Sequence, residues 1–300
     1  VGIASTQPQT RLDIGNGGFQ VGPTGITTVT TINTTNIANS TPLSNRNYII
    51  NGAMQISQRG QSFAVTGSYT NYTLDRFITE NNHDGASTFT QSSTAPDGFK
   101  NSLKIDVTTA DTSLATNHYM QVQQRVEAQN LQGLAYGTSD AKAITFSFFV
   151  RSNKTGDYSF TLQQNDNSNR QMPSKYTINS ANTWERKIIT VPADTSGAFN
   201  DDNGIGLIIT WGLSYGSAYT TGSVSADNSF KAYDQTDFGA GQGVNLLDST
   251  SNEWYLTGVQ MELGEVATPY EYKTYAQELN ACMRYYEGII MGPGTALMRT

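Results

Sequence analysis

From Arg46 onward, hydrophobic and polar residues follow the pattern of short strands in an all-β domain. Ser102–Val107 alternates as a half-buried strand does, because successive side chains of a strand point to opposite faces of a sheet. Ala143–Val150 is the strongest predicted strand. The other predicted strands are Asn47–Asn51, Tyr119–Val126, Asp157–Leu162, Trp184–Val191, Gly206–Trp211 and Trp254–Met261. Short strands separated by turn residues, with few helices, predict an all-β fold, an antiparallel β-sandwich of the jelly-roll type.

One helix is predicted near the end of the chain. Thr274 and Gln277 have the spacing of a capping box, and Gly288 is a natural stop. Apolar residues recur at helical spacing between them, at Tyr275, Leu279, Cys282 or Met283, and Tyr286. We expect this apolar face to pack against the sandwich or against other copies of the chain. Residues 273–300 would then comprise the helix and the start of a further strand region.

The first 44 residues follow a different pattern. Ile26, Val29 and Ile32 place an apolar residue at every third position, which fits neither the period of 2 of a strand nor the period of about 3.6 of a helix. Three chains wound about one axis can each send such a residue inward. A Thr-rich flexible linker is the alternative. We therefore expect residues 1–44 to form an extended stem or docking segment, ahead of a sandwich over residues 45–272.

Composition and charge exclude several kinds of partner. Charged residues make up 14% of the chain, against about 25% in an ordinary soluble domain. The net charge is −7 and no basic block is present, so nucleic acid is not an expected partner. No apolar run approaches the ~18 residues of a membrane span, so we expect no membrane insertion. Because the sequence starts at Val1 with neither a methionine nor a signal-peptide pattern, we expect a processed chain or a fragment.

The single cysteine limits disulfide and zinc chemistry. With Cys282 alone, the chain can form neither an intrachain disulfide nor a cysteine-built zinc site. Its neighbours Leu279 and Met283 indicate a buried, inert thiol. His83 lies in a polar run that reads as a loop, and His118 precedes a predicted strand. Nothing sets these histidines at ligand spacing, so we predict no metal site on them and no cofactor.

Two kinds of catalytic site are considered and set aside. Gly212–Gly216 matches the nucleophile-elbow pattern around Ser214, but that pattern needs a following helix and a later histidine. We interpret Ser214 as a turn residue. Glycoside hydrolysis needs two carboxylates about 5–10 Å apart across a cleft. The candidate acids are Asp201, Asp202, Asp234, Asp237, Glu80 and Asp84. The sequence does not place any two of them face to face.

Carbohydrate binding has better support in the sequence. Sugars stack on aromatic faces and take hydrogen bonds from neutral polar side chains, and several aromatic residues after residue 210 lie among Ser, Thr, Asn and Gly. The candidate sugar-binding residues are Trp211, Tyr215, Tyr219 and Tyr233. In the alternative reading, Trp211 belongs to the core and the tyrosines cover strand ends. Trp184 and Trp254 lie within strand patterns and are expected in the core.

Three motifs resemble those of a family of modules at the ends of bacteriophage tail fibres, abundant in phages of marine bacteria. The first is Asn47–Met54, with Gln58–Gly60 and Tyr72–Phe77 after it; the second is Trp254–Gly264 with Ala267–Glu271; the third is the helix Tyr275–Tyr286, lone cysteine included. With the central strands, the resemblance covers roughly residues 45–287. Val1–Ile3 and Pro8–Ile14 also resemble a segment of phage fibre shafts.

The resemblance implies a virion structural protein, usually trimeric, with a sandwich like those of carbohydrate-binding modules. We expect a fibre-type subunit on the outside of a phage particle that forms a homotrimer and contacts other virion proteins and a host-surface polysaccharide. A capsid decoration or head-fibre protein is the main alternative, and a polysaccharide depolymerase is less favoured. Leu256–Val259 lacks the carboxylate that often holds a structural calcium in such sandwiches, which leaves Asp75 and Asp201–Asp202 as candidates for a hard cation.

Overall fold

The computed structural model of the chain describes residues 12–14, 17–19, 45–166 and 169–288. The chain divides into two units, Val1–Thr41 and Pro42–Thr300. In the first unit, β1 (Leu12–Ile14) pairs antiparallel with β2 (Gly17–Phe19). The apolar positions Ile26, Val29 and Ile32 and the end of the chain from residue 289 lie outside the described residues. The threefold stem therefore stays a prediction.

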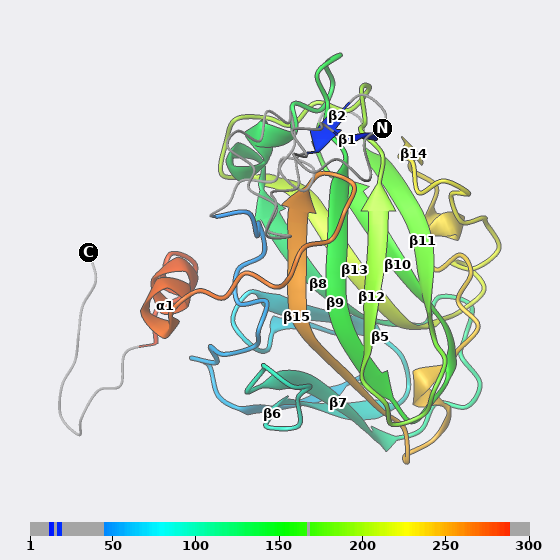
Figure 1. Cartoon of the computed structure of the whole chain (residues 1–300). Helices are drawn as coiled ribbons and strands as arrows, with labels where there is room; N and C mark the ends of the chain where they lie inside the picture. The colour runs from blue at the N-terminus through cyan, green and yellow to red at the C-terminus, as the bar shows by residue number, and fades with distance from the viewer. Residues whose placement is uncertain (1–11, 15–16, 20–44, 167–168, 289–300) are drawn as a thin grey trace, which may run out of the picture. The chain divides into compact units, whose positions relative to one another are not determined.

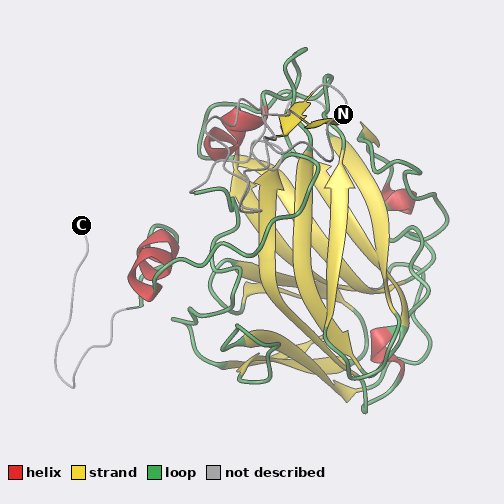
Figure 2. Cartoon of the chain, viewed as in Figure 1, coloured by secondary structure: helices red, strands yellow, loops and turns green. Residues whose placement is uncertain are grey.

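The second unit is a sandwich of two antiparallel sheets (Figures 1 and 2). One has seven strands in the order β14-β11-β10-β13-β8-β5-β4 and the other has six in the order β12-β9-β15-β7-β6-β3. The first sheet comprises β4 (Tyr69–Tyr72), β5 (Phe77–Asn82), β8 (Tyr119–Glu127), β10 (Gly156–Gln164), β11 (Arg170–Ile178), β13 (Ile205–Tyr215) and β14 (Lys231–Ala232). The second comprises β3 (Ser62–Thr66), β6 (Ala86–Ser92), β7 (Ser102–Thr109), β9 (Ile144–Ser152), β12 (Glu185–Val191) and β15 (Glu253–Leu263). The predicted β-sandwich with one C-terminal helix is confirmed.

Aromatic rings from both sheets meet in the core. Trp211 of β13 is fully buried, and its ring centroid lies 5.8 Å from that of Phe148 on β9 and 5.6 Å from that of Phe160 on β10. Trp254 of β15 is also fully buried, as expected. The prediction that Trp211 binds sugar is wrong, because position 211 points into the sandwich. Its neighbours Leu207 and Ile209 on the same face of β13 are fully buried as well.

Asn47–Asn51 does not form the strand that its apolar residues predict. The Asn47 side-chain oxygen accepts hydrogen bonds from the backbone N–H groups of Ile49 (3.0 Å) and Met261 (3.1 Å). Asn51 has a left-handed backbone with φ of +61°, and its side chain bonds to the backbone of Ile56. Asn side chains that compete for backbone groups in this way favour turns over sheet ladders. The segment is therefore buried but irregular.

Two further local predictions are wrong. Trp184 precedes β12, is partly exposed, and packs edge-on against Tyr255 with ring centroids 5.9 Å apart, so it is not a core residue. Ser214 is not in a turn, because β13 continues past an irregularity between Gly212 and Ser214 and ends at Tyr215. Ser214 is fully buried, and its Oγ accepts a 3.3 Å hydrogen bond from the backbone of Leu247.

The predicted helix is α1 (Tyr275–Met283), and it begins with the expected capping box. Glu278 and Cys282 face the sandwich, and the Glu278 carboxylate accepts a 2.7 Å hydrogen bond from the backbone N–H of Asn51. Burial raises the pKa of Cys282 to about 12, so the thiol stays protonated at neutral pH, as the expected inert thiol does. Tyr275 and Met283 remain 60% and 36% exposed, so the predicted apolar face is only partly covered within this chain.

A carboxylate at the start of β12 makes stability depend on pH. Burial alone would raise the pKa of Glu185, but hydrogen bonds from Lys187, Ser180 and Asn179 lower it from 4.5 to about 2. A carboxylate with a depressed folded-state pKa stabilises the fold above its unfolded pKa and loses that contribution as the pH falls through the folded value. We expect the stability advantage of the wild type over Glu185→Gln to shrink between about pH 5.5 and about pH 2. Urea unfolding at both ends of this range tests it, and an equal advantage at both would contradict it.

Candidate functional site

A hollow of about 330 Å³ lies on the outer face of the seven-stranded sheet. Its floor comes from β5, β8, β10 and β13; β8, β10 and β13 lie in the layer behind β9, β12 and β15 in Figure 1. Its side wall comes from the long connection between β13 and β15. The lining residues are Glu80, Tyr119, Gln121, Gln123, Arg125, Gln163, Ile208, Tyr215, Tyr219, Tyr233, Gln235 and Phe238.

Strand alternation on β8 explains why polar side chains line this hollow. Met120 and Val122 are buried in the core, so the odd-numbered residues of the strand point to the other face of the sheet. The residues of β8 that line the hollow are Tyr119, Gln121, Gln123 and Arg125. One strand therefore supplies a row of one aromatic and three polar side chains to the hollow.

An aromatic wall stands at one end of the hollow. The rings of Tyr119 and Tyr219 meet edge to face with centroids 5.5 Å apart, and Tyr215 lies 5.7 Å from Tyr219. Gly212 makes room for the Tyr215 ring, because a Cβ at position 212 would lie 2.2 Å from it. The Thr161 hydroxyl of β10 donates a 2.8 Å hydrogen bond to the carbonyl of Phe238, another lining residue, which ties the connection after β13 to the sheet.

Beside the wall, four polar side chains are held by one another. The Glu80 carboxylate accepts hydrogen bonds from the side-chain amides of Gln121 (2.8 Å) and Gln123 (3.0 Å). Arg125 lies 3.5 Å from the other Glu80 oxygen and donates a 3.1 Å hydrogen bond to Gln123. The Tyr215 hydroxyl donates to the Gln121 amide oxygen. The charges of Glu80 and Arg125 thus offset each other, and the two amides are fixed in orientation.

The tyrosine hydroxyls of the hollow are hydrogen-bond donors at neutral pH. Burial raises the pKa of Tyr119, and the charge of Glu80 raises it further. Burial is also the largest cause of the raised pKa of Tyr219 and of Tyr215. A protonated phenol both donates and accepts hydrogen bonds. The hollow therefore combines aromatic faces, amides and hydroxyls without a large net charge.

The sequence identified part of this site. Tyr219 and Tyr233 line the hollow, and Tyr215 contributes to it although the side chain is only 7% exposed. Trp211 lies on the opposite face of β13 and is not part of it. The residues that sequence reasoning missed are Glu80 as a binding residue, Tyr119, Gln121, Gln123 and Arg125. The alternation within Tyr119–Val126 was a signal for the last four, because it places their side chains on one face.

The acids considered for glycoside hydrolysis do not meet in the hollow. Of the described lining residues, only Glu80 carries a carboxylate. Asp237 is buried and accepts hydrogen bonds from Gln171 (3.1 Å) and the Ser223 backbone (2.7 Å). Asp234 caps the short helix η2 (Gln235–Asp237) by accepting from the backbone of Thr236. The paired carboxylates that hydrolysis needs are thus not assembled among these lining residues.

The acids considered for a hard cation have other partners. Asp75 is buried, accepts hydrogen bonds from the backbone and side chain of Gln58, and lies 3.6 Å from Arg59. Asp202 is exposed and accepts a 2.9 Å hydrogen bond from the backbone of Gly204. Among the described residues, the group of acidic and histidine side chains close enough to share a metal ion is instead Asp84, Asp111 and His118. Sequence spacing does not reveal this group, because its members come from two separate connections between strands.

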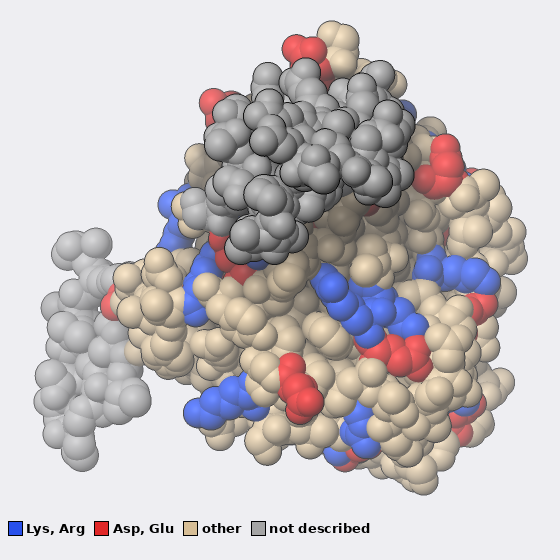
Figure 3. Space-filling view, viewed as in Figure 1, with Lys and Arg blue, Asp and Glu red and all other residues tan. Residues whose placement is uncertain are grey.

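Charges of both signs are mixed on the face of the molecule drawn in Figure 3. Among the described residues in this view, Lys and Arg side chains are interspersed with Asp and Glu. Several of them form ion pairs on the six-stranded sheet, for example Lys104 with Glu253 at 2.9 Å. Among the described helices, none has the length and apolar character to cross a membrane.

Comparison with known proteins gives similarities to solved structures alone, because no family model and no curated protein matches the sequence. The enzymatically active domain of bacteriophage CBA120 tailspike protein 4 is 10% identical, with a TM-score of 0.38 over 72% of this chain and 21% of that chain. A family 11 carbohydrate-binding module from Clostridium thermocellum is 12% identical, with a TM-score of 0.33 over 68% and 99%. The CBM22-2 xylan-binding domain of Paenibacillus barcinonensis Xyn10C is 14% identical, with a TM-score of 0.32 over 67% and 98%. The matched part spans about a fifth of the tailspike structure, and similarity at this level does not assign a function.

Proposed function

We propose that the chain is a non-catalytic carbohydrate-binding protein and that the hollow on the seven-stranded sheet is its binding site. The observation that carries the proposal is the edge-to-face pair Tyr119–Tyr219 beside the fixed amides of Gln121 and Gln123. A sugar ring presents C–H groups that pack on an aromatic face and hydroxyls that pair with amides. An apolar wall with a few convergent polar groups is the usual composition of a small-molecule site.

The charges of the site favour a neutral glycan. Glu80 is the carboxylate in the lining, and its oxygens already accept from Gln121 and Gln123 and face Arg125. An acidic sugar would lie against this carboxylate, and a cationic sugar would lie near the Arg125 guanidinium. Either sugar would bring a like charge close to a charge of the site, and a buried unpaired charge is strongly unfavourable. A neutral hexose or pentose chain avoids both repulsions.

Affinity electrophoresis of the intact chain through gels that contain single polysaccharides tests the proposal. We expect at least one neutral polysaccharide to retard migration, and its soluble oligosaccharides to reverse the effect. Uronic-acid polymers of similar length are the matched control and are expected to retard migration less. If every neutral polysaccharide gel leaves the migration of the chain the same as a gel without polysaccharide, the result argues against carbohydrate binding at this site.

We further propose that this binding unit is part of a trimeric fibre-type subunit on the outside of a phage virion, where it contacts host-surface polysaccharide and other virion proteins. The motifs described above and the period-three pattern of the first unit support this context. A second support is that several apolar side chains of the C-terminal segment remain partly exposed: Val266, Tyr272, Tyr275, Met283 and Tyr286, each between 36% and 60%. Their exposed surface is available for contact with other copies of the chain. Three weak sites on one trimer would gain affinity by multivalency.

The mass of the intact chain in solution, measured by light scattering after chromatography, tests the trimer. We expect a trimer for the wild type. Replacing Ile26, Val29 and Ile32 with serine is expected to lower the mass toward that of one chain, because the inward apolar stripe is lost. A monomeric wild type would contradict the threefold stem, whereas it would leave the carbohydrate site untouched.

A further inference from the structure

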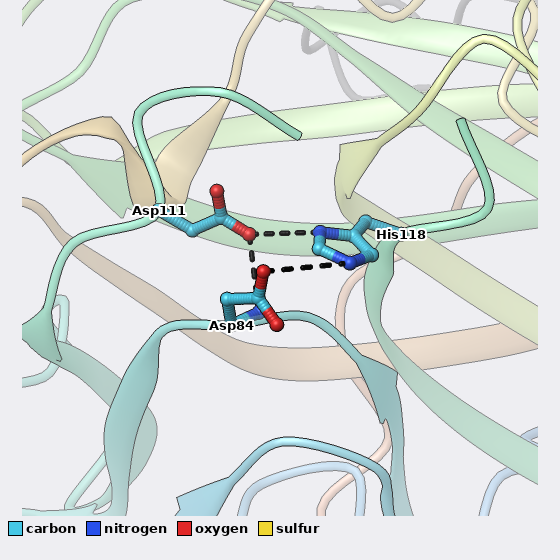
Figure 4. A group of neighbouring side chains, drawn as sticks. All are labelled: Asp84, Asp111 and His118. Carbon is cyan, nitrogen blue, oxygen red and sulfur yellow. Dashed lines mark hydrogen bonds and ion pairs between the residues drawn. The ribbon is translucent and has the colours of Figure 1, made fainter. Parts of the chain in front are cut away.

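A cluster of one histidine and two aspartates lies where the chain crosses between the two sheets. Asp84 is in the turn from β5 to β6, which crosses from the seven-stranded to the six-stranded sheet, and Asp111 and His118 are in the returning connection from β7 to β8. Each of the three offers a ligand atom within 4.8 Å of the others. Figure 4 shows the His118 ring with one nitrogen toward each carboxylate.

Asp111 fixes the orientation and tautomer of His118. The Nδ1 atom of His118 lies 2.9 Å from Asp111 Oδ2, and both residues are buried. Asp111 Oδ2 also accepts a 3.1 Å hydrogen bond from the backbone N–H of Asp84, which ties the two crossovers together. Because a carboxylate accepts, Nδ1 carries the proton of the neutral imidazole and the lone pair lies on Nε2. A carboxylate that holds a histidine in this way is the common support of a metal-binding imidazole.

The second ring nitrogen points at an exposed carboxylate. His118 Nε2 lies 3.9 Å from Asp84 Oδ2, and the Asp84 side chain is 88% exposed. Two ligands bound to zinc at about 2.0–2.1 Å in tetrahedral geometry lie roughly 3.3 Å apart. A rotation of the exposed Asp84 side chain is enough to bring its carboxylate from 3.9 Å to this distance from His118 Nε2. The buried partner, Asp111, does not need to move.

A second, buried histidine lies beside the cluster. His83 precedes Asp84 in the same turn and is 2% exposed, and among the described residues none makes a hydrogen bond of ordinary geometry with either ring nitrogen. Asp111, His118 and Asp84 are all close enough to His83 to act on its charge. The Gly85 backbone also lies close enough to favour the charged ring. A buried polar group of this kind is commonly explained by a bound water or ion.

We propose that His118 Nε2 and the Asp84 carboxylate bind a first-row divalent cation of the zinc class, with Asp111 as the positioning residue and His83 beside the site. The ligand set selects this class, because imidazole suits zinc, copper and nickel whereas calcium takes six to eight oxygen ligands. Two protein ligands leave coordination positions for water or for a ligand from another molecule.

The cation would act on the end of the sandwich that also carries the sugar site. His118 directly precedes Tyr119 on β8, and its carbonyl accepts a 2.7 Å hydrogen bond from the N–H of Gly216, which follows Tyr215. A bound cation would link the β5–β6 turn to the β7–β8 connection and so hold the start of β8 in place. The site itself does not depend on the proposed sugar binding.

Calorimetric titration of Zn²⁺ into the intact chain tests the site. We expect one Zn²⁺ per chain, and Ca²⁺ at the same concentration should give no saturable heat. Asp84→Asn should weaken Zn²⁺ binding at least tenfold. Asp97→Asn is the matched control, because Asp97 is an exposed acid in another loop, and it should leave binding unchanged. Asp84 is exposed, so its substitution does not threaten folding.

A second measurement follows the imidazoles themselves. The chain has only two histidines, so histidine-labelled protein gives two sets of ring signals in NMR spectra. We expect Zn²⁺ to shift those of His118 in the wild type and in Asp97→Asn, and to shift them far less in Asp84→Asn. Absence of saturable Zn²⁺ binding, binding that survives Asp84→Asn, or unchanged ring signals on titration would each overturn the proposal.

Discussion

Replacing Tyr119 and Tyr219 together with alanine is expected to lower the affinity for the bound glycan about 30-fold or more. Each ring at the centre of a binding site typically contributes more than about 1 kcal/mol, and about 1.4 kcal/mol corresponds to a tenfold change in affinity. The two rings support each other edge to face at 5.5 Å, so the single substitutions should each disturb the remaining ring. Calorimetric titration with the oligosaccharide chosen in the polysaccharide screen measures the effect.

Tyr275→Ala is the matched control for this pair. It removes the same side chain from α1, where Tyr275 is 60% exposed and does not line the hollow. We expect its affinity for the glycan to equal that of the wild type. If Tyr275→Ala weakens binding as much as the double variant does, the glycan binds near the C-terminal helix and not on the seven-stranded sheet. Urea unfolding of each variant checks that the fold is intact.

Trp211→Ala is expected to lower the free energy of unfolding by about 3–5 kcal/mol, because a large buried ring is lost and a cavity stays behind. The indole is fully buried and contacts the rings of Phe77, Phe148 and Phe160 from both sheets. Denaturant unfolding measures the change.

Trp184→Ala provides the comparison for Trp211. This indole lies outside the core and packs on Tyr255, so we expect a loss of about 1 kcal/mol. A loss below about 1 kcal/mol at Trp211 would contradict its role as the centre of the core. If Trp211→Ala instead weakens sugar binding without lowering the stability, Trp211 is a binding residue after all.

The sequence predicted the elements whose local pattern and tertiary role agree. β9, β7 and β8 alternate as strands do, and each lies in a sheet with one face in the core. The capping box of Thr274 and Gln277 fixes the start of α1 through contacts only three residues apart. These features depend on neighbouring residues alone, so one sequence suffices to find them.

Other strands were missed because polar residues occupy their buried positions. β5 places Thr79 and Asn81 in the interior, and their side chains are satisfied by a hydrogen bond to each other at 2.7 Å. β11 buries Gln171, whose amide bonds to Asp237 and to the backbone of Asp234, about 60 residues later in the chain. Such strands alternate weakly in hydrophobicity, and only the tertiary partners explain their burial.

The candidate sites were hardest to predict because their parts are far apart in the sequence. The sequence points to Tyr219 as an aromatic residue among small polar ones, but its ring partner Tyr119 lies on β8, far earlier in the chain. Asp84 and His118 come from two separate crossovers, which only the order of strands in the two sheets brings together. Trp211 was misassigned because residue type alone does not tell which face of β13 it occupies.

The most direct test of carbohydrate binding is a crystal structure of the intact chain with the oligosaccharide chosen in the screen. We predict a sugar ring against Tyr119 and Tyr219, with its hydroxyls hydrogen-bonded to the amides of Gln121 and Gln123. A sugar bound to the six-stranded sheet or to the C-terminal segment, with this hollow empty, would contradict the proposed site.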